Sequence, residues 1–205
     1  MKWQLNKILY PVYNLGNGKR IGIWVQGCNL KCKGCVNKKL WSRKGGKSIS
    51  VMDVFNWIVS IQNDFDGITV TGGEPFQQYE QLISFLHLIK TKTNLTVYCF
   101  SGYYLNELEE QFTDKLFLRY IDWLVDGRYI EMLHENTNVK GSENQSVYQI
   151  IDEVPIKQNQ TSASKRWSIN VSNDNRIYMT GIPKWNQLNE LCNELAEFGI
   201  NKTFR

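Results

Sequence analysis

Short apolar runs alternate with amphipathic stretches along most of this chain. Four of the runs are rich in β-branched and aromatic residues and are bounded by Gly, Asp, Asn or Ser, which is typical of buried strands. These runs cover residues 21–27, 67–73, 95–102 and 121–129. Strands that alternate with helices in this way predict β/α units on a largely parallel sheet, and hence an α/β fold.

Apolar residues at helical spacing lie between these strands. Ser50 and Asp53 resemble a capping box and predict that a first helix begins there. A second helix is predicted over residues 77–91, and a short third helix carries Leu105 and Leu108 on its apolar side.

The last quarter of the chain has a different pattern. Residues 159–164 are polar and are predicted to form a loop or linker. Two alternating runs within residues 167–181 flank the turn residues SNDN and predict a β-hairpin. Pro183 marks the start of a final helix. We therefore expect a core domain of residues 1–158 and a hairpin–helix extension, residues 159–205, that packs on it.

The composition argues against some classes of protein. The 205 residues include 24 basic and 20 acidic side chains, and the net charge of +4 is too small to indicate nucleic-acid binding. The longest apolar stretch, residues 116–125, is interrupted by Arg119 and Asp122, so we expect no membrane span. The first segment is too polar for a signal peptide, and we expect a reducing, cytoplasmic location.

The string GCNLKCKGC contains three of the five cysteines: Cys28, Cys32 and Cys35. Three thiolates at CxxxCxxC spacing can hold three irons of a [4Fe–4S] cluster. The fourth iron would then have no protein ligand and would be open to a small molecule.

A zinc site with a distant fourth ligand, in a non-catalytic interaction module, is the alternative. The remaining Cys and His residues are His87, Cys99, His134 and Cys192. None of them forms a second CxxC or HxxxH pair, which a zinc ribbon normally has. Cys99 lies in a predicted strand and Cys192 on the apolar side of a predicted helix, so we interpret both as core packing. His87 lies beside an apolar helix stripe and is interpreted as structural.

A polar or glycine-bearing string lies at the carboxyl end of each of the four predicted strands. The strings are the cysteine loop, GGEP at 72–75, SGY at 101–103 and DGR at 126–128. Ligands of open α/β sheets bind at the carboxyl ends of the strands. One pocket that contains a metal therefore explains all four strings together.

Each string has a physical use in such a pocket. Gly72 and Gly73 lack Cβ atoms, so a ligand can approach the backbone closely, and Glu74 is placed to meet a cationic group. Asp126 and Arg128 alternate along a strand end and can face one side. That pair could hold a ribose hydroxyl and a carboxylate.

Four lysines surround the cysteines: Lys31, Lys33, Lys38 and Lys39. They fit an ordinary solvated loop, and they equally fit a surface that steers an acidic electron donor toward the cluster. Composition does not choose between the two interpretations.

CxxxCxxC followed by GGEP resembles the radical S-adenosylmethionine (SAM) superfamily. The strings GNGKRIGIWVQGCNLKCKGCVN, SGY, DWLVDGRY and KGSENQ further resemble the activating enzymes of anaerobic (class III) ribonucleotide reductase, over residues 8–151. The resemblance implies a partial (β/α) barrel of the radical SAM type. Cys28, Cys32 and Cys35 would hold the cluster, and the amine and carboxylate of SAM would chelate the open iron.

The resemblance also implies which residues bind SAM. The matching positions are Gly72, Gly73 and Glu74 for the methionyl amine, Ser101 and Gly102 for the nucleotide, Asp126 and Arg128 for ribose and carboxylate, and Asn37 for the adenine. Reductive cleavage of SAM would give a 5′-deoxyadenosyl radical, which would take a hydrogen atom from a glycine of the reductase. The implied partners are the reductase large subunit and a flavodoxin or ferredoxin electron donor, without nucleic acid or membrane.

The residues beyond Ile150 depart from compact activating enzymes, which end sooner. This tail either completes the sheet and covers one barrel edge, or recognises a different substrate. A radical SAM enzyme of the same architecture that modifies another peptide or a small molecule therefore remains an alternative.

Overall fold

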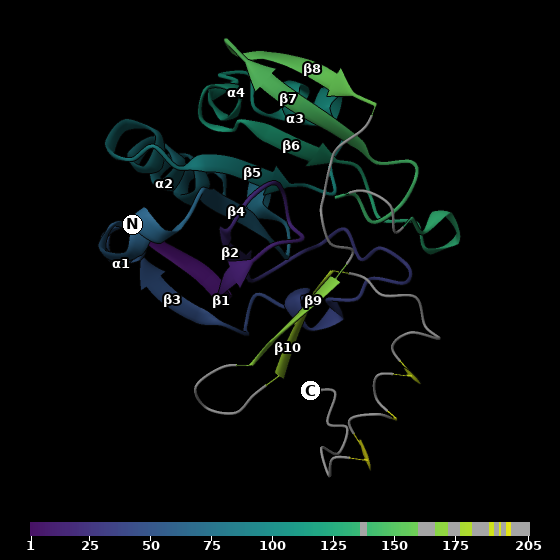
Figure 1. Ribbon diagram of the computed structural model, residues 1–205. Coiled ribbons are helices and arrows are strands. Elements are labelled where there is room, and N and C mark those ends of the chain that lie inside the picture. Colours follow the sequence, from purple (N-terminus) through teal and green to yellow (C-terminus); the bar gives the residue numbers. More distant parts are fainter. Residues whose placement is uncertain are drawn as a thin grey trace.

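The computed structural model describes residues 1–135, 139–159, 167–171 and 177–181, with a few positions between 189 and 197. Within these ranges, eight strands form one mixed sheet in the order β3-β1-β2-β4-β5-β6-β7-β8 (Figure 1). The strands are β1 (Lys2–Val12), β2 (Arg20–Val25), β3 (Lys47–Ser50), β4 (Gly67–Gly72), β5 (Thr96–Phe100), β6 (Trp123–Asp126), β7 (Ser146–Ile151) and β8 (Val154–Gln158).

The helical elements alternate with these strands. The α-helices are α1 (Val51–Ile61), α2 (Tyr79–Lys92), α3 (Leu105–Gln111) and α4 (Leu116–Tyr120), and the 3-10 turns are η1 (Lys38–Leu40), η2 (Gln62–Asp64), η3 (Pro75–Gln78) and η4 (Glu131–Leu133). Among the described residues, no helix is both long enough and apolar enough to cross a membrane.

The centre of the sheet is parallel: β2 pairs with β4, β4 with β5, and β5 with β6. Antiparallel strands flank this centre, with β1 and β3 on one side and β7 and β8 on the other. Because β3 and β8 are the two ends of the order, the sheet stays open, as a partial barrel requires. The predicted α/β class is confirmed.

The helices cover one face of this sheet (Figure 1). All six residues of β2 are buried, and alternate ones face opposite sides. Ile21, Ile23 and Val25 join the main core with the buried faces of α1, α2, α3 and α4. Trp24 points to the other side, where it packs with Leu9 and other residues of a smaller cluster.

The predicted hairpin forms on that second side of the sheet. β9 (Trp167–Val171) pairs antiparallel with β10 (Ile177–Gly181). Thr180 Oγ1 donates to Asn14 Oδ1 at 2.8 Å, and Tyr178 packs against the cluster that contains Trp24. Lys7 Nζ lies 5.3 Å from the ring centroids of both Trp24 and Tyr178. Most of the predicted final helix, including Cys192, lies outside the described residues.

Four strands, and the cause of one helix start, were not predicted from the sequence. β1 and β3 precede the expected helix at Ser50, while β7 and β8 form a hairpin across Asp152 and Glu153, which both have positive φ. Helix α1 begins where it was predicted to begin, but the Ser50 side chain makes no capping hydrogen bond, so the capping-box interpretation was wrong. Ser50 is instead the last residue of β3.

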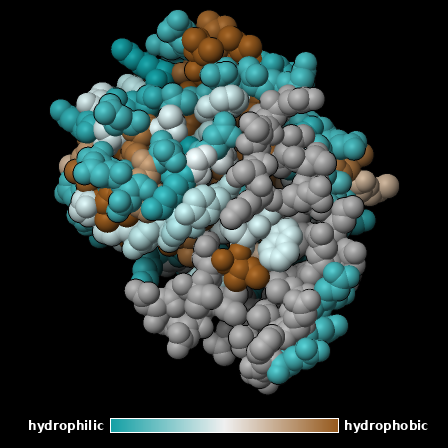
Figure 2. Space-filling model, in the orientation of Figure 1, coloured by the Kyte–Doolittle hydropathy of each residue, from teal (hydrophilic) through white to brown (hydrophobic). Residues whose placement is uncertain are grey.

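Strand β8 is an edge of the sheet, and it is protected against further pairing. Pro155 has no N–H to offer, and Lys157 adds charge to the same strand. Ile151, Val154 and Ile156 are exposed there, and Figure 2 shows apolar side chains gathered at the end of the molecule that β7 and β8 form.

Arg20 joins three parallel strands at their amino ends, and its side chain is fully buried. The guanidinium donates to Asn17 O, Ile68 O, Thr69 Oγ1, Thr96 O and Thr96 Oγ1. It also lies over the Tyr98 ring, 4.6 Å from the centroid. Burial lowers the pKa of Arg20 to about 10, so the group remains cationic at neutral pH.

We expect Arg20→Lys to lower the free energy of unfolding by about 3 kcal/mol, because a lysine cannot supply the planar fork and leaves buried acceptors without donors. Urea unfolding of the two proteins measures this difference. The exposed Arg119 provides the matched control, and Arg119→Lys should change the stability by less than about 0.5 kcal/mol. Equal stability of Arg20→Lys and the parent chain would contradict the role given to Arg20.

Candidate functional site

The loops that carry the four strings lie side by side at the ends of the parallel strands. Hydrogen bonds join each loop to its neighbour. Gly73 N donates to Val25 O and Glu74 N to Gly27 O, both at 2.9 Å, so GGEP is joined to the start of the cysteine loop. SGY is joined to the end of β6 by Ser101 N donating to Val125 O at 2.8 Å. The structure thus brings the predicted strings to one edge of the sheet.

The cysteine loop is anchored at its beginning. Gly27 N donates to Leu40 O at 2.8 Å, and Cys28 N donates to Trp41 O at 3.1 Å. A further bond, from Cys35 N to Cys32 O at 3.1 Å, closes a turn inside the loop. The loop is therefore held against the turn η1 and the residue that follows it.

Gln26 and Gln78 add side-chain bonds that the sequence analysis did not foresee. Gln26 Nε2 donates to Ser42 O at 2.5 Å, and Gln78 Nε2 donates to Gln26 O at 3.1 Å. These two amides connect the cysteine loop, η1 and η3. Glutamine carries no spacing signal that would have marked it beforehand.

The three thiols of the loop are free and half-buried. Burial raises the pKa of Cys28, while backbone N–H groups of Leu30 and Lys31 lower it by bonding to the sulfur. Burial also raises the pKa of Cys32, and the nearby Cys35 adds to that shift. Metal binding would deprotonate such thiols, since the iron replaces the proton.

Among the described residues, no three His, Cys, Asp or Glu side chains are arranged to hold a metal ion. The chemistry of the loop nevertheless fits an iron–sulfur cluster, because its ligands are all soft thiols with N–H groups directed at the sulfur atoms. Cys99 lies apart, fully buried in β5, where burial raises its pKa well above the usual value.

Glu74 is the most buried acid of the site, with 1% of its surface exposed. Its Oε1 accepts from Phe76 N at 3.1 Å and from Ser101 Oγ at 3.0 Å, and its Oε2 accepts from Gly102 N at 2.7 Å. Burial raises the pKa of Glu74 to about 7, and the three hydrogen bonds and Arg128 oppose that shift. Such a carboxylate is stabilised by a cation that enters its surroundings.

The glycines before Glu74 have a structural reason that the sequence did not reveal. A Cβ on Gly72, whose φ is +106°, would lie 2.8 Å from Trp24 Cα. One on Gly73 would lie 2.2 Å from Gly27 O. Both positions require glycine because the backbone of the neighbouring strand end is already in contact. Approach of a ligand to this backbone stays a prediction.

Asp126 is also buried, and its two oxygens are engaged by backbone groups. Oδ2 accepts from Leu105 N at 2.7 Å, at the start of α3, and Oδ1 accepts from Ser146 N at 3.1 Å, at the start of β7. Burial raises the pKa of Asp126. Arg128 is half-exposed and forms an ion pair with Glu107 at 3.3 Å.

The KGSENQ string braces the DGR turn, a role that its resemblance alone did not indicate. Asn144 Nδ2 donates to Arg128 O at 2.8 Å, and Gln145 Nε2 donates to Gly127 O at 2.7 Å. Gln145 Oε1 in turn accepts from Gly141 N at 2.8 Å. The string therefore fixes the backbone on which Arg128 stands.

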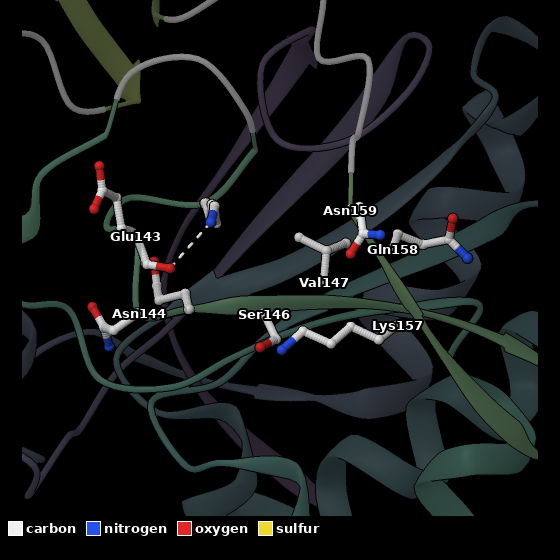
Figure 3. Close-up of a pocket in the computed structure, with 9 residues that line it drawn as sticks. Glu143, Asn144, Ser146, Val147, Lys157, Gln158 and Asn159 are labelled. Atoms are coloured by element: carbon white, nitrogen blue, oxygen red, sulfur yellow. Dashed lines mark hydrogen bonds between the residues drawn. The ribbon is translucent and has the colours of Figure 1, made fainter.

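A cavity of about 180 Å³ lies behind this brace. Its lining consists of Lys140, Glu143, Asn144, Gln145, Ser146, Val147, Lys157, Gln158 and Asn159. Figure 3 shows the Lys157 side chain extending toward Ser146. The cavity borders the site because Asn144 and Gln145 line it. None of the predicted site residues lines the cavity, so it is separate from the site.

Asn37 is the last of the predicted site residues, and the two histidines were not predicted to belong to the site. Asn37 precedes η1 and is half-buried, two residues after Cys35. His87 is exposed and contacts Tyr120 OH at 3.2 Å, while His134 Nδ1 contacts Gly141 O at 3.1 Å. Neither histidine lies in the cysteine loop.

Comparison with known proteins places this chain in a family. Residues 14–148 match the family described as "4Fe-4S single cluster domain", a range that contains all four strings. A relative from Haemophilus influenzae, named anaerobic ribonucleoside-triphosphate reductase-activating protein, is 31% identical over 140 residues, which are 65% of this chain and 89% of the relative. The protein of that name from Enterobacteria phage T4 is 27% identical over 151 residues, which are 71% and 94% of the two chains.

A pyruvate formate-lyase-activating enzyme from Clostridium pasteurianum is 33% identical over 99 residues, which are 46% of this chain and 42% of that enzyme. Among solved structures, QueE from Escherichia coli has a TM-score of 0.42 and 19% identity, and the match covers 50% of this chain and 53% of QueE. The family match and the Haemophilus relative decide the assignment: the chain belongs to the radical SAM activating enzymes with a 4Fe-4S single cluster domain, in the family of the anaerobic ribonucleoside-triphosphate reductase-activating proteins.

Proposed function

We propose that this chain generates a glycyl radical on an anaerobic ribonucleotide reductase, with a [4Fe–4S] cluster and SAM as cofactors. The observation that carries the proposal is the hydrogen-bonded series of strings at the carboxyl edge of β2, β4, β5 and β6. The names of the relatives support the choice of partner, because the reductase activators match 89% and 94% of their own lengths.

Cys28, Cys32 and Cys35 are the proposed cluster ligands. When bound, the reduced cluster supplies the electron that cleaves SAM to methionine and a 5′-deoxyadenosyl radical. The protein contributes by holding SAM in one orientation and by excluding water. The loop that carries the thiols is suited to holding SAM in one orientation, because backbone hydrogen bonds anchor the loop to η1.

Glu74 is proposed to bind the methionyl amine of SAM, beside Gly72 and Gly73. Its carboxylate is already oriented by Ser101 and Gly102. The Ser101 hydroxyl and the Gly102 amide already donate to Glu74. We therefore propose that these two residues contact the nucleotide through their other atoms.

Asp126 and Arg128 are proposed to contact the ribose and the carboxylate of SAM, and Asn37 the adenine. The carboxylate of Asp126 has acceptor capacity beyond its two backbone bonds, because an ionised carboxylate offers about four lone-pair sites. To bind the carboxylate of SAM, Arg128 would give up its half-exposed ion pair with Glu107. Breaking such an exposed ion pair costs little free energy.

The division of the chain follows from the same proposal. We propose residues 1–158 as the radical SAM core domain and residues 159–205 as an extension packed on it. Contacts of Thr180 with Asn14 and of Tyr178 with the Trp24 cluster support this packing. We also propose a cytoplasmic location, because free thiols need a reducing compartment. The proposed electron donor is a flavodoxin or a ferredoxin.

Replacing any one of the cluster cysteines should abolish cluster binding. We expect Cys32→Ala, reconstituted without oxygen, to lose its iron and sulfide and to form no 5′-deoxyadenosine from SAM. Cys99→Ala is the matched control and should keep both, at a stability cost of about 1 kcal/mol. SAM cleavage by Cys32→Ala would refute the ligand assignment, and tightly bound zinc in the parent chain would favour the interaction module.

Glu74→Gln should weaken SAM binding at least about tenfold while the cluster content stays unchanged, because a charge-assisted hydrogen bond to the amine is lost. Equilibrium binding of SAM to the reconstituted protein measures the effect. Glu109→Gln makes the same chemical change in an exposed pair with Lys115 and should bind SAM normally. Normal binding by Glu74→Gln would place the amine elsewhere.

The choice of partner is tested by electron paramagnetic resonance. The reduced chain with SAM should produce a glycyl radical on the anaerobic reductase and none on a pyruvate formate-lyase. A radical on the lyase alone would transfer the activity to that partner. SAM cleavage without a radical on either protein would favour another peptide or small-molecule substrate.

A further inference from the structure

Positive charge is concentrated around the cysteine loop. The chain carries seven basic residues and no acidic residue between Gly27 and Met52. We define these seven as the basic collar: Lys31, Lys33, Lys38, Lys39, Arg43, Lys44 and Lys47. All are exposed. Since the whole chain has a net charge of +4, the residues outside the collar together carry −3.

The fold gathers the collar around the thiols. Cys28 N bonds to Trp41 O, so the second half of the collar lies against the start of the cysteine loop. Arg43 lies over Gly27, where an added Cβ would come within 2.9 Å of Arg43 Cγ. None of the ion pairs in the described part of the chain involves a collar residue. The collar side chains are therefore exposed and make no ion pair within the described residues, while the carboxylate of Glu131 lies against Gly34, beside Lys33.

Two exposed apolar side chains lie beside this charged surface. Val36 is 58% exposed and follows Cys35 directly, and Met132 on η4 is 95% exposed. Contact between the two segments is close, since a Cβ on Gly34 would lie 2.6 Å from Glu131 Cβ. A small apolar centre with a charged rim is the usual composition of a protein contact surface.

We propose that the basic collar, with Val36 and Met132, is the docking surface for an acidic one-electron carrier protein. This inference rests on the proposed function, because reductive cleavage of SAM takes one electron. The reduced carrier would lose one electron and the oxidised cluster would gain it, with no bond made or broken. An electron can pass to the cluster through the half-buried thiols, so the carrier need only reach their exposed side.

Charge favours a carrier over the reductase as the occupant. Electron-transfer complexes have small interfaces and form rapidly through long-range attraction, which a surface of uniform sign provides. The reductase glycine must instead reach SAM itself, which we assigned to the region of Glu74. The collar therefore suits a partner that needs proximity to the cysteines alone.

The test compares Lys33→Glu/Lys38→Glu with Lys92→Glu/Arg119→Glu, which changes the net charge equally but lies on α2 and α4. The probe is a purified acidic flavodoxin, and its binding to each iron-loaded chain is measured by calorimetry at low and at near-physiological salt. We expect the collar variant to bind about tenfold more weakly or worse, the control to bind normally, and binding to the parent chain to weaken with salt.

The second readout is 5′-deoxyadenosine formation with two reductants. The collar variant should be slower than the parent chain with reduced flavodoxin and equal to it with dithionite, which needs no docking. Equal flavodoxin binding by variant and parent would overturn the proposal. The proposal would also be overturned if the collar variant bound flavodoxin normally but formed no radical on the reductase with dithionite as the reductant. That result would assign the collar to the reductase.

Failure of the proposed function has a different signature. In that case the parent chain would bind flavodoxin and cleave SAM but would leave no radical on the reductase. The docking surface would then stand with a different radical substrate.

Discussion

The arrangement of this molecule depends on a buried cation at the amino ends of its parallel strands. Arg20 begins β2, and its guanidinium bonds to Ile68 and Thr69 of β4 and to Thr96 of β5. Those bonds fix the register of three neighbouring strands at one edge of the sheet. Strands of fixed register also end in fixed positions. The carboxyl ends of these strands are therefore aligned, and the loops of the candidate site begin at defined points.

Two buried carboxylates do the corresponding work at the carboxyl edge. Glu74 joins GGEP to SGY, and Asp126 joins the end of β6 to the starts of α3 and β7. Burying an acid is unfavourable, as the raised pKa values of both groups indicate. The hydrogen bonds offset part of this cost, and the result is a site whose loops are held in place by the protein's own groups.

The four central strands could be predicted because each is a short, mainly apolar run that ends in a polar or glycine-bearing string. β1 was missed because Asn6 and Lys7 interrupt its alternation and the run is bulged against β2. β7 and β8 were missed because only Val147 and Ile150 of that hairpin are buried, which leaves a weak apolar signal. The four site strings could be foreseen as one edge, whereas the partners of Glu74 and Asp126 depend on distances that only the folded chain defines.

The tight contact at Gly72 and Gly73 affects how mutational scans of this protein should be interpreted. Any side chain at either position would collide with the backbone at the end of β2 or just beyond it, before a cofactor is present. A complete set of substitutions there would be depleted for reasons of folding, and the depletion would look the same whether or not SAM touches these residues. Intolerance at the two glycines therefore says nothing about the ligand.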